Sequence, residues 1–146
     1  RFKTFTAQEI MGRSEARGVG PCKAGVGLAQ WTSSNRRVGL FRHSFEGRPP
    51  GTGILFDMDA QIDYLDTELK RDYPGVLILL RDPTVTPERA CDEVMYSFER
   101  PGSVYTRDAK GKLRRLPRNN PQVLAAFAER RKYVQEVLRA YGRGAS

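Results

Sequence analysis

Prolines divide the second half of this chain into segments whose apolar residues recur at helical spacing. Proline has no backbone N–H and its ring clashes with the preceding turn, so a proline marks where a helix begins or has already ended. Between these prolines, apolar residues return every three or four positions, as on the buried face of an amphipathic helix. The pattern predicts helices over residues 57–72, 87–100 and 121–142, bounded by Pro74, Pro87, Pro101 and Pro121.

Weaker signals place short helices in the first third of the chain. Thr6 is a suitable cap for a helix over residues 7–15, and Asn35 for a second helix that ends near Phe41. Residues 75–81 form an apolar run that fits either a buried helix or a strand. The fold is therefore predicted to be mainly α-helical.

Two helices carry an apolar stripe that predicts their buried faces. In the first, the stripe consists of Met58, Ile62, Leu65 and Leu69. In the last helix, which Gly142 is expected to end, it consists of Val123, Phe127, Val134, Val137, Leu138 and Tyr141. Between these helices, residues 102–119 are a basic loop with room for a small hairpin at Lys110-Gly111.

The charge of the chain is unevenly distributed. The net charge is +8, yet residues 51–99 carry eleven acidic and four basic residues, whereas residues 100–146 carry three and twelve. The fold must bring these blocks together or display them on different faces. A basic surface suits a polyanion, such as a bacterial wall with anionic polymers, a nucleic acid or an anionic lipid, or it serves only to keep the protein in solution.

Length and composition exclude several classes of protein. With 146 residues, the chain is long enough for one compact domain, and two independent domains are not expected. No apolar run approaches the length that crosses a bilayer, so no membrane insertion is expected. One histidine and two distant cysteines form no zinc-binding pattern, and no metal or cofactor is expected. Cys22 and Cys91 form one disulfide if the protein is exported, or are buried apolar side chains.

Four motifs in order resemble one family. Residues 25–37 are Gly-Val-Gly-Leu-Ala-Gln-Trp-Thr-Ser-Ser-Asn-Arg-Arg, which resembles the G-x-G-L-x-Q-W-[ST]…R-R signature of phage tail-type lysozymes. Residues 59–69 resemble the family's Q-x-D-[FY]-L-x-x-E-L helix, and residues 90–101 its A-x-x-F-x-x-x-[FY]-E-x-P segment. Residues 130–141 resemble its closing helix. The resemblance covers roughly residues 20–142.

This resemblance implies a fold, a reaction and a place of action. The implied fold is lysozyme-like, with helices forming two lobes around a glycan cleft, as a single domain over residues 1–146. The implied reaction is general-acid hydrolysis of the β-1,4 bond between N-acetylmuramic acid and N-acetylglucosamine in bacterial peptidoglycan. Such a chain acts in a phage virion, as part of a larger tail or lysis protein, or is exported to the bacterial cell wall or periplasm.

The motif at residues 25–37 also supplies candidate substrate-binding residues. A cleft for a sugar polymer needs flat apolar surface for pyranose faces and amide or hydroxyl groups for polar substituents. Gln30, Trp31 and Thr32 supply these kinds of group in succession. Arg36 and Arg37 offer forked donors for the carboxylates of the lactyl group or stem peptide. The alternative is that Trp31 is a core anchor and both arginines are surface charges.

The catalytic acid is harder to place. Glycoside hydrolysis needs a carboxylic acid that stays protonated near neutral pH. The resemblance implies a glutamate at the end of an N-terminal helix, in a G-N-x-x-x-E-S-like motif that this sequence lacks. One hypothesis places the acid upstream of Arg1. The other selects Glu15, which ends a short helix before two glycines, whereas Glu9 has too little helix before it.

Two other functions compete with hydrolysis. A non-catalytic wall-binding or phage tail structural module would keep the glycan groove without the acid and would bind peptidoglycan without turnover. A nucleic-acid-binding domain is suggested by the basic residues between Lys110 and Arg118. However, aromatic residues do not alternate with these basic ones and no reader motif is present, so no nucleic-acid partner is expected.

Overall fold

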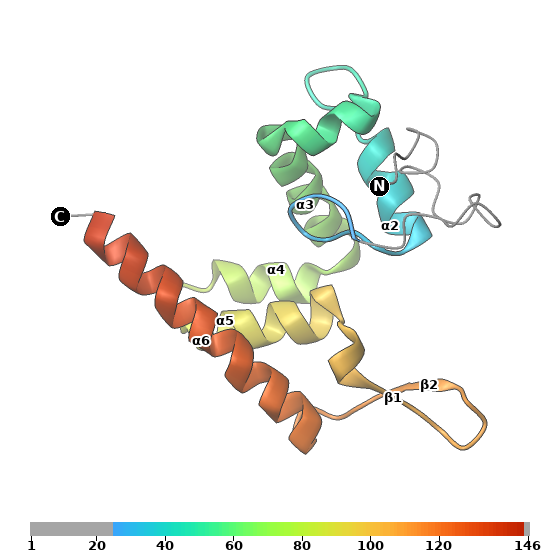
Figure 1. The fold of residues 1–146 in the computed structure, drawn as a ribbon. Helices are drawn as coiled ribbons and strands as arrows, with labels where there is room; N and C mark the ends of the chain where they lie inside the picture. The colour runs from blue at the N-terminus through green and yellow to red at the C-terminus, as the bar shows by residue number, and fades with distance from the viewer. Residues whose placement is uncertain (1–24, 145–146) are drawn as a thin grey trace, which may run out of the picture. The chain divides into compact units, whose positions relative to one another are not determined.

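The fold is mainly α-helical, as predicted. Figure 1 shows the computed structural model of the chain, which describes residues 25–144. Their contacts divide the molecule into two compact units, one ending at Arg71 and the other beginning at Asp72, and each is described by itself. The expected single domain over residues 1–146 stays a prediction, and the helix expected over residues 7–15 lies outside the described residues.

The N-terminal unit contains two α-helices joined by a loop and a short 3₁₀ helix. Helix α2 spans Ser34–Arg42, the 3₁₀ helix Gly51–Phe56, and helix α3 Met58–Asp72. The Asp57 carboxylate accepts a hydrogen bond from the Ala60 backbone N–H at 3.0 Å. This bond satisfies one of the free donors at the start of α3, so Asp57 fixes where that helix begins.

Helix α2 begins earlier than its sequence indicates. Ser33 is the last extended residue before it, and the Ser33 carbonyl accepts the backbone N–H of Arg37 at 2.9 Å. Because this bond closes the first helical turn, Asn35 lies inside that turn and not at the cap. The predicted cap at Asn35 is therefore wrong by two residues.

The buried face of α3 also differs from the predicted stripe. Met58 and Ile62 expose 56% and 50% of their surface, whereas Gln61, Tyr64 and Glu68 are buried. The helix turns these polar residues inward because each has a hydrogen-bond partner inside the unit. The Tyr64 ring belongs to the apolar core, and Gln61 and Glu68 lie beside it. The other members of that core are Val26, Trp31, Leu40, Phe41, Ile54 and Ala60.

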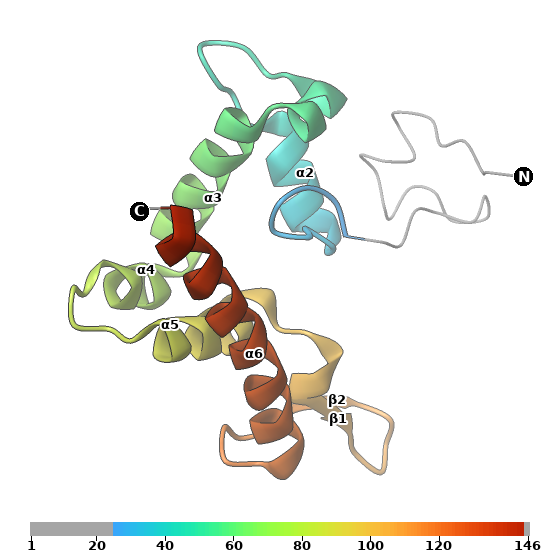
Figure 2. The same ribbon diagram turned by 60° about the vertical axis from the view of Figure 1, so that its left-hand side comes forward.

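The C-terminal unit packs helices against a short hairpin. Its elements are α4 (Pro74–Arg81), α5 (Pro87–Glu93), a π-helical turn (Val94–Glu99), a 3₁₀ turn (Gly102–Val104), β1 (Tyr105–Arg107), β2 (Leu113–Arg115) and α6 (Pro121–Gly144). Helices α4 and α5 lie side by side and α6 packs across α5, in both Figure 1 and Figure 2. Met95, Val104, Val123 and Phe127 form the core.

Several boundaries in this unit follow from the sequence. Residues 75–81 are helical, which settles the choice between helix and strand. Helix α5 begins at Pro87, as predicted, and the Thr86 hydroxyl caps it by accepting the Arg89 N–H at 3.2 Å. Helix α6 continues to Gly144, so the predicted end at Gly142 is wrong. Gly142 does not adopt the left-handed conformation that ends many helices, and the helix therefore passes through it.

The apolar face of α6 is covered only in its first half. Val123 and Phe127 are buried, whereas Val137 and Tyr141 expose 66% and 78% of their surface. The prediction of a fully buried face is therefore wrong for the second half, where Val137 helps to line a shallow apolar depression next to Cys91. Within residues 25–144, no helix combines the length and apolar character needed to cross a membrane.

We expect Gly39→Ala to destabilise the N-terminal unit although alanine favours helices. A Cβ at this position of α2 would lie 2.3 Å from the Tyr64 hydroxyl oxygen and 3.1 Å from the ring carbon that bears it. The buried Tyr64 ring has little freedom to move, and such overpacking costs about 1–3 kcal/mol. Urea unfolding followed by circular dichroism would measure the change in stability.

Gly75→Ala is the matched control, because Gly75 lies in helix α4 with open space around it. There the substitution should stabilise by up to about 1 kcal/mol. Equal effects of the two substitutions would contradict the close packing of α2 on Tyr64.

Candidate functional site

Residues 25–32, which carry the glycine-rich motif, form a tight turn. Val26 and Trp31 pair across it through two backbone hydrogen bonds of 3.1 and 2.9 Å. The Gln30 N–H donates to the Gly27 carbonyl at 3.1 Å. The motif is therefore a closed loop whose end residues are held together by backbone bonds.

Helix α3 fixes this turn through Gln61. The Gln61 side-chain oxygen accepts the backbone N–H of Leu28 at 2.7 Å, and its amide group donates to the Ile54 carbonyl at 2.9 Å. Gly27 has a φ of +67°, and a Cβ there would lie 2.6 Å from the Gln61 oxygen and 2.9 Å from the Trp31 ring. Only glycine fits this conformation and this space, which explains one glycine of the motif.

Gln30 and Thr32 lie on the outer side of the turn. Gln30 is exposed and has a left-handed backbone with a φ of +50°. Its side-chain amide donates to the Gly27 carbonyl at 3.2 Å, and the Thr32 hydroxyl donates to the Gln30 carbonyl at 2.7 Å. These contacts hold amide and hydroxyl groups at the surface of the turn, where they are accessible to a polar ligand.

Glu68 is the buried carboxylate of the unit. One of its oxygens accepts the Trp31 indole N–H at 2.9 Å. The Arg36 guanidinium donates to both oxygens, at 2.7 and 2.9 Å. Glu68 has no exposed surface, and Arg36 keeps 18% of its side chain exposed. A buried carboxylate requires such partners, because an unpaired charge in the core costs several kcal/mol.

Tyr64 links the same group to helix α2. The Tyr64 hydroxyl donates to the Arg36 carbonyl at 3.1 Å. The centroids of the Tyr64 and Trp31 rings are 5.3 Å apart. Burial raises the pKa of the Tyr64 hydroxyl, and the negative charge of Glu68 raises it further. Tyr64 therefore stays neutral and a hydrogen-bond donor throughout the physiological range.

The predicted substrate-binding residues divide into two groups. Gln30, Thr32 and Arg36 reach the surface of the turn or lie close to it. Trp31 and Arg37 have no exposed surface. This burial favours the alternative that Trp31 is a core anchor, whereas the alternative that Arg37 is a surface charge is wrong.

Sequence reasoning missed the importance of Glu68 and did not place the acid. Gln61 and Glu68 are seven positions apart on α3, so they lie on one face of the helix together with Tyr64. This spacing is the sequence signal for the buried face of α3. The apolar residues Met58 and Ile62 indicated a different face, so the signal was missed. Glu15, the candidate acid, lies outside the described residues.

The cysteines are placed only in part. Cys91 lies half-buried in α5, and burial raises the pKa of its thiol. Cys22 lies outside the described residues, so the choice between a disulfide and two apolar side chains stays a prediction.

The chain is mostly helical, and a glutamine and a glutamate of helix α3 fix its glycine-rich turn. This arrangement is consistent with a lysozyme-like domain. A comparison with family models gives the match: the model described as phage tail lysozyme covers residues 6–141. The chain therefore belongs to the phage tail lysozyme family. No curated protein and no solved structure matches the chain significantly. At the level of the family, the protein is a lysozyme-like peptidoglycan hydrolase.

We expect Glu68→Gln to cost about 3 kcal/mol of unfolding free energy, because it breaks a buried ion pair and leaves the Arg36 charge without its partner. Chemical denaturation at neutral pH would measure the change. Asp66→Asn is the control, since Asp66 lies on the same helix in an exposed ion pair with Lys70. Its cost should stay below about 0.5 kcal/mol. Equal costs would show that burial of the Glu68 charge is unimportant.

Proposed function

We propose that this chain hydrolyses the β-1,4 bond between N-acetylmuramic acid and N-acetylglucosamine in bacterial peptidoglycan. The observation that carries the proposal is the family match over residues 6–141. The proposed place of action is the bacterial cell wall, reached as part of a phage particle or after export. The protein would act there as one segment of a larger tail or lysis protein.

The proposed glycan contacts come from the outer side of the glycine-rich turn. Gln30 and Thr32 offer an amide and a hydroxyl for N-acetyl and hydroxyl groups of the sugar. Arg36 lies in the first turn of α2, and Glu68 fixes its guanidinium through two bonds. An anchored guanidinium loses little conformational entropy when it binds a carboxylate of the lactyl group or stem peptide.

Trp31 and Arg37 would act indirectly in this proposal. Trp31 supports the turn from the core, through the Glu68 bond and its pairing with Val26. Because Trp31 is buried, other residues must provide the apolar surface for pyranose rings. Leu28, half exposed on the same turn, is the described residue of the turn that offers such surface.

The proposed general acid is Glu15. A glutamate that donates a proton to the leaving oxygen needs a raised pKa, which an apolar pocket provides. Glu15 is the candidate within this chain because it ends a short predicted helix and precedes two glycines. The competing hypothesis places the acid before Arg1, and in that case the chain retains the glycan contacts without catalysis.

Digestion of purified peptidoglycan by the chain, with released fragments identified by mass spectrometry, tests the reaction. We expect fragments that end in a reducing N-acetylmuramic acid, because hydrolysis adds water at that end. Fragments that end in an anhydro sugar would identify a transglycosylase instead. Absence of fragments, with the chain still sedimenting with the wall, would support a wall-binding module.

Glu15→Gln tests the acid. If Glu15 donates the proton, the rate should fall about 10²- to 10⁴-fold, the usual contribution of a general acid. Wall binding should be unchanged, because the amide has the same shape. Glu9→Gln is the matched control and should cleave at the parental rate. Full activity of Glu15→Gln would remove Glu15 as the acid.

A further inference from the structure

The β1–β2 hairpin is held by hydrogen bonds at both ends, and its tip lies in solvent. Tyr105 pairs with Arg115, Thr106 with Arg114, and Arg107 with Leu113. The Asp108 carboxylate closes the turn, because it accepts the backbone N–H groups of Lys110 at 3.0 Å and Lys112 at 2.9 Å. At the other end, the Leu116 N–H donates to the Val104 carbonyl at 2.9 Å and ties the hairpin to the core.

The hairpin and the segment after it are strongly basic. Residues 107–118 contain one acidic residue, Asp108, and six basic residues: Arg107, Lys110, Lys112, Arg114, Arg115 and Arg118. Asp108 is occupied inside the hairpin: besides the turn amides, it accepts the Arg114 guanidinium at 2.9 Å. These bonds hold the pKa of Asp108 below its usual range, with the Arg114 bond the largest cause. The one acid of the segment thus serves the turn and is unavailable to neutralise the other cations.

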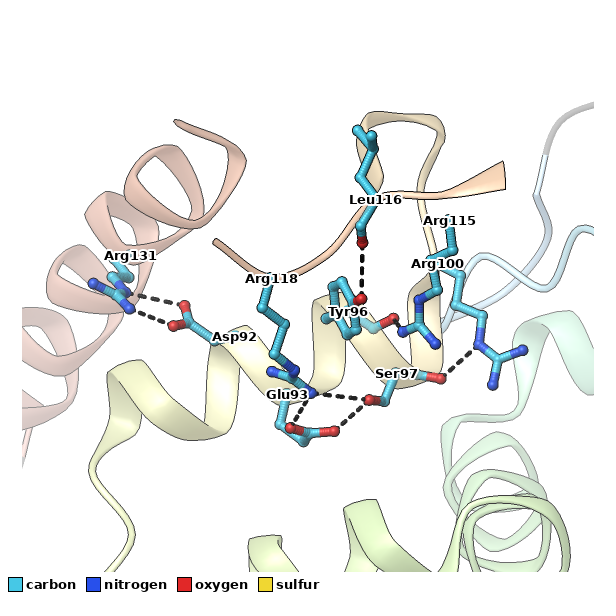
Figure 3. Close-up of polar contacts among 9 residues, drawn as sticks. All are labelled: Asp92, Glu93, Tyr96, Ser97, Arg100, Arg115, Leu116, Arg118 and Arg131. Carbon is cyan, nitrogen blue, oxygen red and sulfur yellow. Dashed lines mark hydrogen bonds and ion pairs between the residues drawn. The ribbon is translucent and has the colours of Figure 1, made fainter. Parts of the chain in front are cut away.

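Two of these cations are held at the base of the hairpin. Arg118 forms an ion pair of 2.5 Å with Glu93. Figure 3 shows this pair, and it shows Arg115 lying against Tyr96. The guanidinium carbons of Arg115 and Arg118 lie 3.7 and 4.3 Å from the centre of the Tyr96 ring. These arginines are therefore part of the fold, and their cation–π contacts cover the aromatic ring.

The remaining cations, Arg107, Lys110 and Lys112, lie at the exposed tip. Arg107 donates to the Gly111 carbonyl at 2.8 Å, a contact that leaves its charge unneutralised. In the part of the chain that the structure describes, none of the three forms an ion pair with a carboxylate. A cluster of exposed cations at one hairpin tip raises the local concentration of anions. Such a cluster is a surface for a polyanion.

We propose that the hairpin tip binds the phosphodiester polymer of bacterial cell walls, which would hold the enzyme on its substrate. This proposal rests on the proposed function, since that function brings the protein to the wall. Guanidinium and ammonium groups bind phosphate oxygens through charge-assisted hydrogen bonds. A flexible polymer of repeating phosphates can meet all three cations, and the attraction does not depend on a particular sugar sequence.

The hairpin offers less to a nucleic acid. Recognition of single strands depends on exposed aromatic rings on which bases stack. Tyr105 is half-buried against the core of the unit, and the Tyr96 ring is covered by two arginines. The exposed apolar residue of the strands is Leu113, which has no aromatic face. The chemistry that remains is phosphate binding without base recognition.

The test measures binding of the full chain to soluble poly(glycerol phosphate) at several salt concentrations. The variant replaces all three tip cations: Arg107→Ala, Lys110→Ala and Lys112→Ala. The control removes three exposed cations from α5 and α6, Arg89→Ala, Lys132→Ala and Arg139→Ala, and so has the same net charge. A further variant, Lys110→Arg with Lys112→Arg, keeps the charge of the tip.

We expect the tip variant to bind about tenfold more weakly, and the control and charge-keeping variants to bind within about twofold of the parent. The slope of log affinity against log salt should become shallower by about 2 for the tip variant, because each phosphate bound by a cation contributes about 0.7 to that slope. Equal weakening in the tip and control variants would overturn the proposal, since net charge alone would explain it. Tighter binding to duplex DNA at equal phosphate concentration would also overturn it.

A second measurement separates this proposal from the proposed hydrolysis. Walls chemically stripped of phosphate polymer retain peptidoglycan, so the parent and the tip variant should digest them at equal rates. Intact walls should be digested more slowly by the tip variant. If no variant digests stripped walls, the proposed hydrolysis fails, and binding to the soluble polymer still decides the role of the hairpin.

Discussion

The buried carboxylate of Glu68 is the interaction on which the N-terminal unit depends. It accepts the indole N–H of Trp31 and two bonds from Arg36, so one side chain of α3 fixes both the end of the glycine-rich turn and the start of α2. Gln61, on the same face of α3, fixes the middle of that turn. The surface groups proposed to contact the glycan therefore owe their positions to two buried polar residues.

Charge pairing organises the C-terminal unit in a similar way. The acidic residues of α5 meet the basic end of the chain: Asp92 pairs with Arg131, Glu93 with Arg118, and Glu99 of the following turn with Arg130. Figure 3 shows the first two of these pairs, which involve adjacent residues of α5. The unequal charge distribution of the sequence thus partly reflects these ion pairs, which join its acidic and basic blocks. The cations that this pairing leaves exposed include those at the tip of the hairpin.

The helices were predictable because prolines and apolar spacing act locally. Thr86-Pro87 begins α5, and a helix follows Pro74 as its short apolar run allowed. The buried face of α3 was not predictable in this way, because Gln61 and Glu68 are buried through partners more than thirty residues away. The same limit applies to Trp31. Its sequence position is compatible with a cleft or a core, and only its burial against Glu68 in the folded unit favours the core. The exposure of the second half of α6 likewise depends on which elements cover it, and the spacing of its apolar residues does not reveal this.

The contacts of Glu68 also set the order in which the chain can fold. Trp31 and Glu68 are 37 positions apart, and Arg36 and Glu68 are 32. The entropy of closing such a loop must be overcome before any of these bonds forms. During synthesis from the N-terminus, helix α2 and the glycine-rich turn therefore wait for their partner until residue 68 has left the ribosome. The contacts that join the turn and α2 to α3 can therefore form only once α3 has been synthesised.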